Sequence, residues 1–185
     1  MENHDLVARI DSEIEKHSLL KHPFYQMWSE GRLTVDHLQG YSKEYFQLVK
    51  AVPAFVQNIA SSNTDLAKAQ EIKENLKEES EHVEPWVRFA HAMGVSQSEL
   101  ASYAGAEKTN DAVAKMMSLT SLSFEEAVAA MYAFEAELPK ISRSKLDGLV
   151  KFYNMTGNKD ALNYFEIHEK ADIRHAQVWR DLLRT

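Results

Sequence analysis

Three residues near the end of the chain have the types and spacing of metal ligands. His168, Asp172 and His175 follow one another at intervals of four and three residues. In an α-helix these positions lie within about 60° of one another around the axis, so all three side chains can converge on one point. The composition predicts about 0.05 such triplets in the whole chain, so the triplet is unusual, although it does not decide the function alone.

Two other segments supply candidate ligands of the same kind. Glu79 and His82 stand three residues apart, which places a carboxylate and an imidazole on one helical face, as in di-iron helix bundles. This pair is weak by itself, because about 1.2 acidic-x2-His pairs are expected by chance. Glu135 lies between Phe134 and Leu138, where an inward carboxylate is costly unless it is paired or bound to a metal.

Together the six residues offer imidazoles and carboxylates in equal number. The three carboxylates carry three negative charges, and two divalent cations would carry four positive charges. The remaining positive charge could be balanced by an oxygen-derived anion. Such a set suits two iron or manganese ions bridged by a carboxylate better than one closed zinc site. The alternative, which spacing alone leaves open, is that the histidines are half-buried and the acids are solvated.

Composition limits the remaining possibilities. The chain has 185 residues, no cysteine and a formal net charge of −7. Thiolate metal sites, disulfides and cysteine nucleophiles are therefore excluded, and the acidic balance argues against nucleic acid as the main partner. The polar N-terminus lacks the apolar core of a signal peptide, and no apolar run is long enough to span a membrane, so we expect a cytoplasmic protein.

The periodicity of apolar residues predicts one all-α domain over residues 1–185, built from seven or eight helices. Thr34, Ser96 and Ser123 are expected N-caps, the last two within capping boxes completed by Glu99 and Glu126. Pro53 should kink the long helix that contains it, and Pro85 should bend or break the next one. The predicted helices cover residues 6–19, 24–28, 34–59, 64–94, 124–138, 141–155 and 160–183, with one more opening at Ser96.

The sequence around these residues resembles the CADD-like group (Chlamydia protein associating with death domains), which belongs to the haem-oxygenase-like di-metal oxidases and is related to PqqC and TenA. The matching stretches extend from Lys21 to Ala176 and read HPFYQMWSEGRLT, LQGYSKEYF, NLKEESEHVEPWVRFAHAMGV, MYAFEAELPKISRSKLDGL and YFEIHEKADIRHA. The combination is specific to the group, whereas the single stretches are not.

This resemblance implies a haem-oxygenase-like helical bundle and a role in the synthesis of para-aminobenzoate, the aromatic precursor of folate. It implies two metal ions, iron or manganese or one of each, with O2 and a reductant as co-substrates, and it implies a homodimer. By resemblance the metal ligands are the six residues described above. The sacrificed tyrosine that supplies the ring matches Tyr25, a second tyrosine near the centre matches Tyr41, and the suggested amino donor matches Lys145.

The chain departs from the family pattern in two places. The Glu and His of the first ligand helix are separated by a longer insert in the family, whereas Glu79 and His82 are only three apart. Glu78, four residues before His82, is therefore a rival ligand. The chain also ends at Thr185, without the C-terminal extension of the chlamydial protein, so death-domain binding is not carried over.

Other interpretations remain open on the sequence. Tyr25 and Tyr41 suit an aromatic core, and Lys145 stands in a basic stretch where a solvated lysine is ordinary. A PqqC-like oxidase would act on a quinone precursor, TenA-like hydrolysis would need the absent cysteine, and haem oxygenase would need an axial ligand such as His17 or His22. A helical interaction module would need no metal at all.

Overall fold

The computed structural model describes residues 3–64 and 66–184, and in these residues all regular secondary structure is helical. The segments are α1 (Asn3–Lys16), the short 3-10 helix η1 (Leu19–Lys21), α2 (Pro23–Ser29), α3 (Val35–Val49), α4 (Val52–Ser62), α5 (Leu66–Glu81), α6 (Val83–Ala92), α7 (Gln97–Ser102), α8 (Glu107–Thr120), α9 (Phe124–Glu135), α10 (Leu138–Lys151) and α11 (Lys159–Leu183). The expected all-α architecture is thus present in the described residues.

Three of the expected helices are each divided in two. Pro53, at the start of α4, separates that helix from α3, and Pro85 lies in the first turn of α6, just after α5 ends. Proline has no N–H to donate and clashes with the preceding turn, which is why the breaks fall there. Gly105, with a φ of +77°, separates α7 from α8 because a left-handed backbone suits glycine.

The predicted helix starts are confirmed. Thr34 accepts a hydrogen bond from the His37 backbone at the start of α3. Ser96 and Ser123 open α7 and α9, each in a capping box completed by the glutamate three residues later. These caps satisfy backbone N–H groups that have no partner inside the helix.

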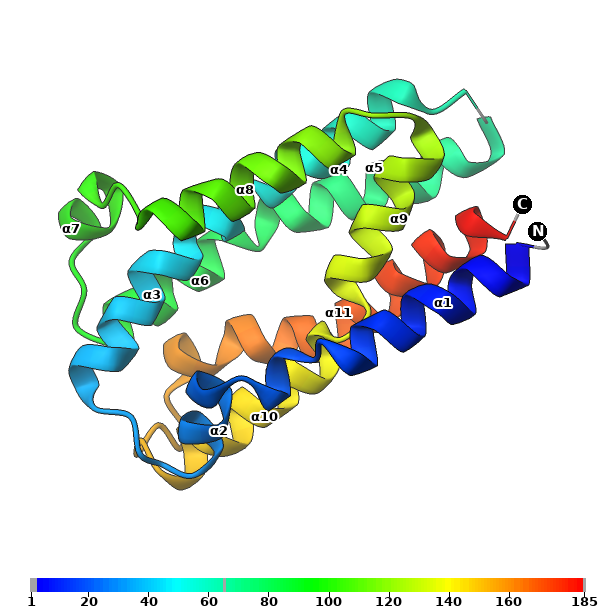
Figure 1. Cartoon of the computed structure of the whole chain (residues 1–185). Coiled ribbons are helices and arrows are strands. Elements are labelled where there is room, and N and C mark those ends of the chain that lie inside the picture. Colours follow the sequence, from blue (N-terminus) through cyan, green and yellow to red (C-terminus); the bar gives the residue numbers. More distant parts are fainter. Residues whose placement is uncertain (1–2, 65, 185) are drawn as a thin grey trace.

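The long helix α11 is the centre of the fold, since it packs against α10, α9 and α6. Figure 1 shows α3, α4, α5, α6 and α8 along one side of the molecule and α1, α10 and α11 along the other, with α9 crossing between them. None of the helices in the described residues is long and apolar enough to cross a bilayer.

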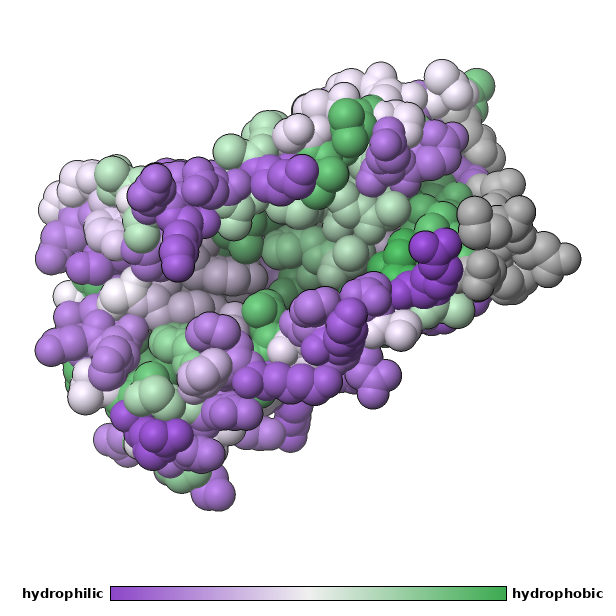
Figure 2. Space-filling view, in the orientation of Figure 1, coloured by the Kyte–Doolittle hydropathy of each residue, from purple (hydrophilic) through white to green (hydrophobic). Residues whose placement is uncertain are grey.

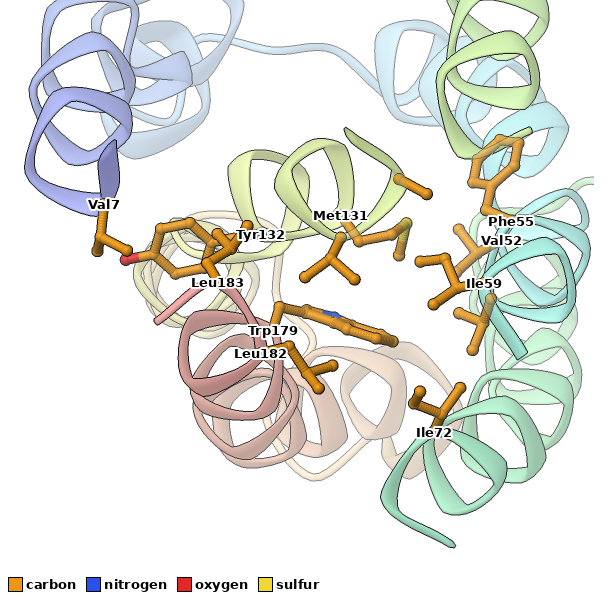
Figure 3. Close-up of a cluster of buried hydrophobic side chains, with 13 residues drawn as sticks. Val7, Val52, Phe55, Ile59, Ile72, Met131, Tyr132, Trp179, Leu182 and Leu183 are labelled. Atoms are coloured by element: carbon orange, nitrogen blue, oxygen red, sulfur yellow. The ribbon is translucent and has the colours of Figure 1, made fainter. Parts of the chain in front are cut away.

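Two apolar clusters hold these helices together. Trp179 of α11 is fully buried in the first cluster, between Met131 of α9 and residues of α4 and α5 such as Ile59 (Figure 3). The second cluster combines aromatic and aliphatic side chains, with Trp86 of α6 and Phe165 of α11 among its buried members. α11 contributes to both clusters, so its middle turns lie between them.

Candidate metal centre

All six expected ligands are buried where the helices pass from one apolar cluster to the other. Their relative exposures are 6% for Glu79, 7% for His82, 1% for Glu135, 4% for His168, 1% for Asp172 and 0% for His175. They come from three stretches of chain: the α5–α6 junction, the end of α9 and the middle of α11. The interpretation of solvated acids and half-buried histidines does not hold for these side chains.

Five of the six form two overlapping groups that could each hold a metal ion. One group is Glu79, His82 and His168, and the other is Glu79, Asp172 and His175; within each group the ligand atoms lie within 4.8 Å of one another. Glu79 belongs to both groups, with its Oε1 at 3.0 Å from His175 Nδ1 and 3.4 Å from His82 Nδ1. A shared carboxylate between two groups of ligands is the arrangement that a bridged pair of ions needs.

Glu135 lies beside these groups rather than within either of them. Its Oε2 accepts a hydrogen bond of 2.6 Å from Trp179 Nε1. Its other oxygen, Oε1, is buried without a hydrogen-bond partner, as are both carboxylate oxygens of Asp172 and the Nδ1 atom of His82. Buried acceptors without donors are costly, and a cation would satisfy them, so the donor set fits a metal.

The acid–base properties of the cluster lead to the same conclusion. Burial raises the pKa of Asp172 and of Glu135, and the charge of Glu79 raises both further. Burial alone would raise the pKa of Glu79, but the close imidazoles of His175 and His82 outweigh it and lower that pKa overall. Without cations the pocket therefore favours protonated carboxyl groups, because it holds too many negative charges close together.

The two histidines of α11 are held in different ways. His168 Nδ1 lies 2.7 Å from the backbone carbonyl oxygen of Tyr164, and burial lowers the pKa of His168 to about 4. His175 instead has its Nε2 atom 2.7 Å from Glu78 Oε2. Burial alone would lower the pKa of His175, but the Glu79 and Glu78 carboxylates raise it to about 9. Glu78, the rival ligand, thus contacts the outer nitrogen of His175 and belongs to neither group.

The structure also brings Tyr25, Tyr41 and Lys145 together. The Lys145 side chain is only 2% exposed, and its Nζ donates a hydrogen bond to the Tyr41 hydroxyl. The same Nζ lies 5.0 Å from the centre of the Tyr25 ring, and a hydrogen bond joins the Tyr25 and Tyr41 hydroxyls. The ordinary interpretation of Lys145 as a solvated lysine is wrong.

Burial dominates the electrostatics of this trio. It lowers the pKa of Lys145 well below the usual value, and it raises the pKa of Tyr25 to about 12 and that of Tyr41 well above normal. An amine and two phenols that all favour their neutral forms can share hydrogen bonds in an apolar pocket without paired counter-ions.

Aromatic rings connect this trio to the metal ligands. The ring centres of Tyr41 and Tyr45 are 5.5 Å apart, and Tyr45 lines the same small cavity as Glu79, His168 and Asp172. Tyr164 stacks on His168 at 3.9 Å between ring centres. Both tyrosines therefore lie beside the centre, in the space between the ligands and the Lys145 network.

Sequence reasoning passed over three residues that belong to this region. Tyr164 and Trp179 stand four residues before His168 and four residues after His175 on α11, and Asn75 stands four before Glu79 on α5. Asn75 is buried and its amide nitrogen has no hydrogen-bond partner. Their spacing of four residues from the expected ligands could have indicated that they belong to the site, because residues four apart in a helix share a face.

The cavity beside the ligands is small. It measures about 10 Å³ and is lined by Tyr45, Phe134, Leu138 and Tyr164 together with four of the expected ligands. Such a volume accommodates about one water-sized molecule. Phe134 also lines a much larger surface groove of about 640 Å³ between α1 and the α9–α10 junction, in the region where Figure 2 shows hydrophobic residues in a hollow.

Comparison with known proteins places the chain in a family. Residues 11–181 match the TENA/THI-4/PQQC family, which is most of the chain. The chain belongs to this family. Among TENA/THI-4/PQQC relatives, the 4-aminobenzoate synthase of Chlamydia pneumoniae is 34% identical over 184 residues, covering 97% of this chain and 81% of that protein. The 4-aminobenzoate synthase of Nitrosomonas europaea is 33% identical, covering 92% of this chain and 74% of that protein.

Solved structures confirm the TENA/THI-4/PQQC fold. A TenA homologue from P. horikoshii superimposes with a TM-score of 0.77 at 14% identity, covering 100% of this chain and 85% of that one. A TenA homologue from Pseudomonas syringae pv. tomato gives a TM-score of 0.76 at 17% identity, covering 89% and 72%. The resemblance inferred from the sequence is therefore confirmed at the level of family and fold.

Proposed function

We propose that this protein makes 4-aminobenzoate in an O2-dependent reaction at a pair of iron or manganese ions, and that its own Tyr25 supplies the aromatic ring. Relatives at 34% and 33% identity, aligned over nearly the whole chain, carry the name 4-aminobenzoate synthase. The buried cluster of imidazoles and carboxylates supports the metal requirement.

The ions would be held by Glu79, His82, Glu135, His168, Asp172 and His175. When bound and reduced, they would supply the electrons that turn O2 into a strong oxidant, with an external reductant restoring them. The protein itself orients the target ring and keeps bulk water away, as the low exposure of these side chains indicates.

The observation that carries the proposal is the contrast between the tiny cavity and the residues around it. A cavity of about 10 Å³ has no room for an aromatic substrate next to the ligands. Tyr25 is already inside the protein, at 9% exposure, in hydrogen-bond contact with Tyr41. A ring supplied by the chain has a very high effective concentration and needs no substrate pocket.

Lys145 has the chemistry of a nitrogen donor. Conversion of a tyrosyl side chain into 4-aminobenzoate requires cleavage of the Cα–Cβ bond and oxidation of Cβ to a carboxylate, with O2 as the oxidant. It also requires replacement of the phenolic oxygen, which leaves as water, by a nitrogen whose bond to Cε of Lys145 must break. Burial lowers the pKa of Lys145, so a larger fraction of its amine carries a free electron pair than in a solvated lysine. Tyr41 receives a hydrogen bond from this amine and holds it beside Tyr25. Because both reactants are part of the chain, each molecule would complete very few turnovers.

The test uses protein grown with ring-13C tyrosine and reconstituted without air with iron, manganese or both. After addition of O2 and a reductant, mass spectrometry should detect ring-labelled 4-aminobenzoate and a matching loss of mass from the chain. Tyr25→Phe should abolish the product while metal content is retained, and Tyr153→Phe, at a ring outside the network, is the control. Labelled product in undiminished amount from Tyr25→Phe would contradict the role of Tyr25.

A second candidate is an oxidase that acts on a small molecule, as PqqC-like proteins do. The groove of about 640 Å³ favours it, because this volume suits a small ligand and Phe134 lies between the groove and the inner cavity. In that case purified protein would keep its mass after exposure to O2, and a product would form only when an external aromatic compound is added.

A further inference from the structure

Glu78 lies between a buried histidine and an exposed arginine, at the edge of the candidate metal centre. Its Oε2 atom lies 2.7 Å from Nε2 of His175 and 2.5 Å from the Arg174 guanidinium. The Glu78 side chain is 33% exposed, whereas the His175 side chain is 0% exposed. Glu78 therefore reaches from the rim of the bundle onto the outer edge of a buried imidazole.

This contact decides which nitrogen of His175 faces the interior. With Nε2 engaged by Glu78, the Nδ1 atom points inward, 3.0 Å from Glu79 Oε1 and 3.6 Å from Asp172 Oδ1. His168 shows the opposite choice, because the Tyr164 carbonyl engages its Nδ1 and leaves Nε2 for the interior. An imidazole binds a metal through one nitrogen while the other donates its N–H to an acceptor, which fixes both tautomer and orientation.

We propose that Glu78 is a positioning residue for one ion of the pair. It holds the Nε2–H of His175, so that Nδ1 presents its electron pair to the ion that Glu79 and Asp172 also contact. This inference rests on the metal centre of the proposed function. It resolves the choice between the adjacent glutamates Glu78 and Glu79 by giving them different tasks, one behind the imidazole and one between the ions.

The influence of Glu78 should be confined to one side of the centre. His175 belongs only to the group with Asp172, whereas the group with His82 and His168 is oriented by other contacts. Arg174 holds the Glu78 carboxylate in place from the solvent side, with its own side chain 60% exposed. Loss of Glu78 should therefore weaken one of two binding steps and leave the other unchanged.

The experiment is an anaerobic titration of metal-free, full-length protein with Co²⁺, followed by its visible spectrum and by competition with a chelating dye. The wild type should bind two ions. Glu78→Ala should still bind two, with the affinity of one step lowered about 10- to 100-fold, which is the usual effect of removing such a hydrogen-bond partner. Glu78→Gln should lose much less affinity, because its amide oxygen still accepts the Nε2–H of His175.

Two controls separate this role from general damage. Glu81→Gln alters an exposed glutamate of the same helix that pairs with Lys77 at 3.8 Å, and it should leave both steps unchanged. His82→Ala should weaken the step that Glu78→Ala spares. The 15N chemical shift of His175 Nε2 in metal-free protein reports its contact with Glu78 independently of metal. Glu78→Ala should change this shift most, and Glu81→Gln should leave it unchanged.

Three results would overturn the proposal in distinguishable ways. Binding of only one ion by Glu78→Ala would make Glu78 a ligand instead of a positioning residue. Two wild-type-like steps in Glu78→Ala would show that His175 needs no such support, and would leave the metal centre intact. A wild-type protein that binds no Co²⁺ would overturn the metal centre itself, together with everything assigned to Glu78.

Discussion

Lys145 carries an amine that is normally charged and solvated, yet its side chain is buried among aromatic rings. Its ammonium nitrogen lies 4.3 Å from the centre of the Tyr41 ring and 5.0 Å from that of Tyr45, and no carboxylate pairs with it among the described residues. Aromatic faces attract a cation, but this attraction offsets only part of the free energy of hydration that the ammonium group loses on burial. Under the proposed function, this amine is the nitrogen donor beside Tyr25, which would explain why a costly buried lysine is present.

Replacement of Lys145 by methionine should therefore stabilise the fold at pH 7. Burial lowers the pKa of Lys145, so below the normal lysine pKa folding releases protons that the unfolded chain keeps. Each unit of this lowering costs about 1.4 kcal/mol, and the cost falls as the pH rises toward the normal lysine value. The gain of Lys145→Met, measured by urea unfolding, should shrink between pH 7 and pH 10.

Lys140, exposed on the same helix, provides the control. Lys140→Met should leave the free energy of unfolding nearly unchanged at each pH, because this side chain stays in water in both states. A gain from Lys145→Met that is equally large at pH 7 and pH 10 would contradict the argument from burial.

At the scale of the helices, the contact between α2 and α10 sets the place of Tyr25. Trp28 of α2 donates a hydrogen bond of 3.1 Å from its indole N–H to the Lys145 carbonyl oxygen on α10. A Cβ atom added at Gly148 would lie 2.5 Å from Cδ1 of Trp28, so only glycine permits this approach. The helix that carries Tyr25 is thus fixed against the helix that carries Lys145.

Gly148→Ala should consequently destabilise the protein by about 1–3 kcal/mol, the usual cost of overpacking a core. The matched change is Gly40→Ala in α3, where an added Cβ would meet nothing within 4 Å. That substitution should stabilise the protein by up to about 1 kcal/mol, because alanine favours a helix more than glycine does. Thermal unfolding of both variants measures the difference, and equal effects of one sign would argue against the close packing of Trp28.

At the scale of the whole molecule, the six expected metal ligands lie between the two apolar clusters and come from three parts of the fold. Glu79 and His82 lie at the α5–α6 junction, Glu135 ends α9, and the remaining ligands lie in α11. Bound ions would therefore add a connection between these three parts of the fold at a place where buried acids and imidazoles meet. Any ligand that binds the folded state alone raises its stability.

Metal-loaded protein should accordingly melt at a higher temperature than metal-free protein. At a free metal concentration of 100 times Kd, one ion contributes about 2.7 kcal/mol, or about 5–10 °C for a chain of this size. Asp172→Asn should remove most of this increase. Without metal, the same variant should melt above the wild type, because it removes one of three buried carboxylates that lie close together.

Glu166→Gln serves as the control, since Glu166 is exposed on the same helix. It should change neither the melting temperature of the metal-free protein nor the increase on metal binding. A metal-free Asp172→Asn protein that melts well below the wild type would contradict the view that these acids are costly when no ion is present.

The helix starts, the helix interruptions and the residues that share one helix face could be predicted from the sequence alone. The helix starts at Thr34, Ser96 and Ser123 follow from hydrogen bonds within a few residues. The pitch of one helix puts His168, Asp172 and His175 on a common buried face, but His168 falls in one ligand group and the other two in the second. Pro53 and Pro85 likewise predicted that the helices are interrupted near them, because proline removes a backbone hydrogen bond from the adjacent turn.

Two features depend on the packing of helices: which residues far apart in the chain meet, and which of two residues adjacent in the sequence faces the interior. Glu78 and Glu79 are equivalent in the sequence, but the packing of α5 on α11 turns one toward the ligands and the other toward the outer edge of His175. Lys145 looks like a solvated lysine until α2 and α3 cover it with Tyr25 and Tyr41. Burial depends on contacts between helices far apart in the chain, so periodicity within one helix cannot specify it.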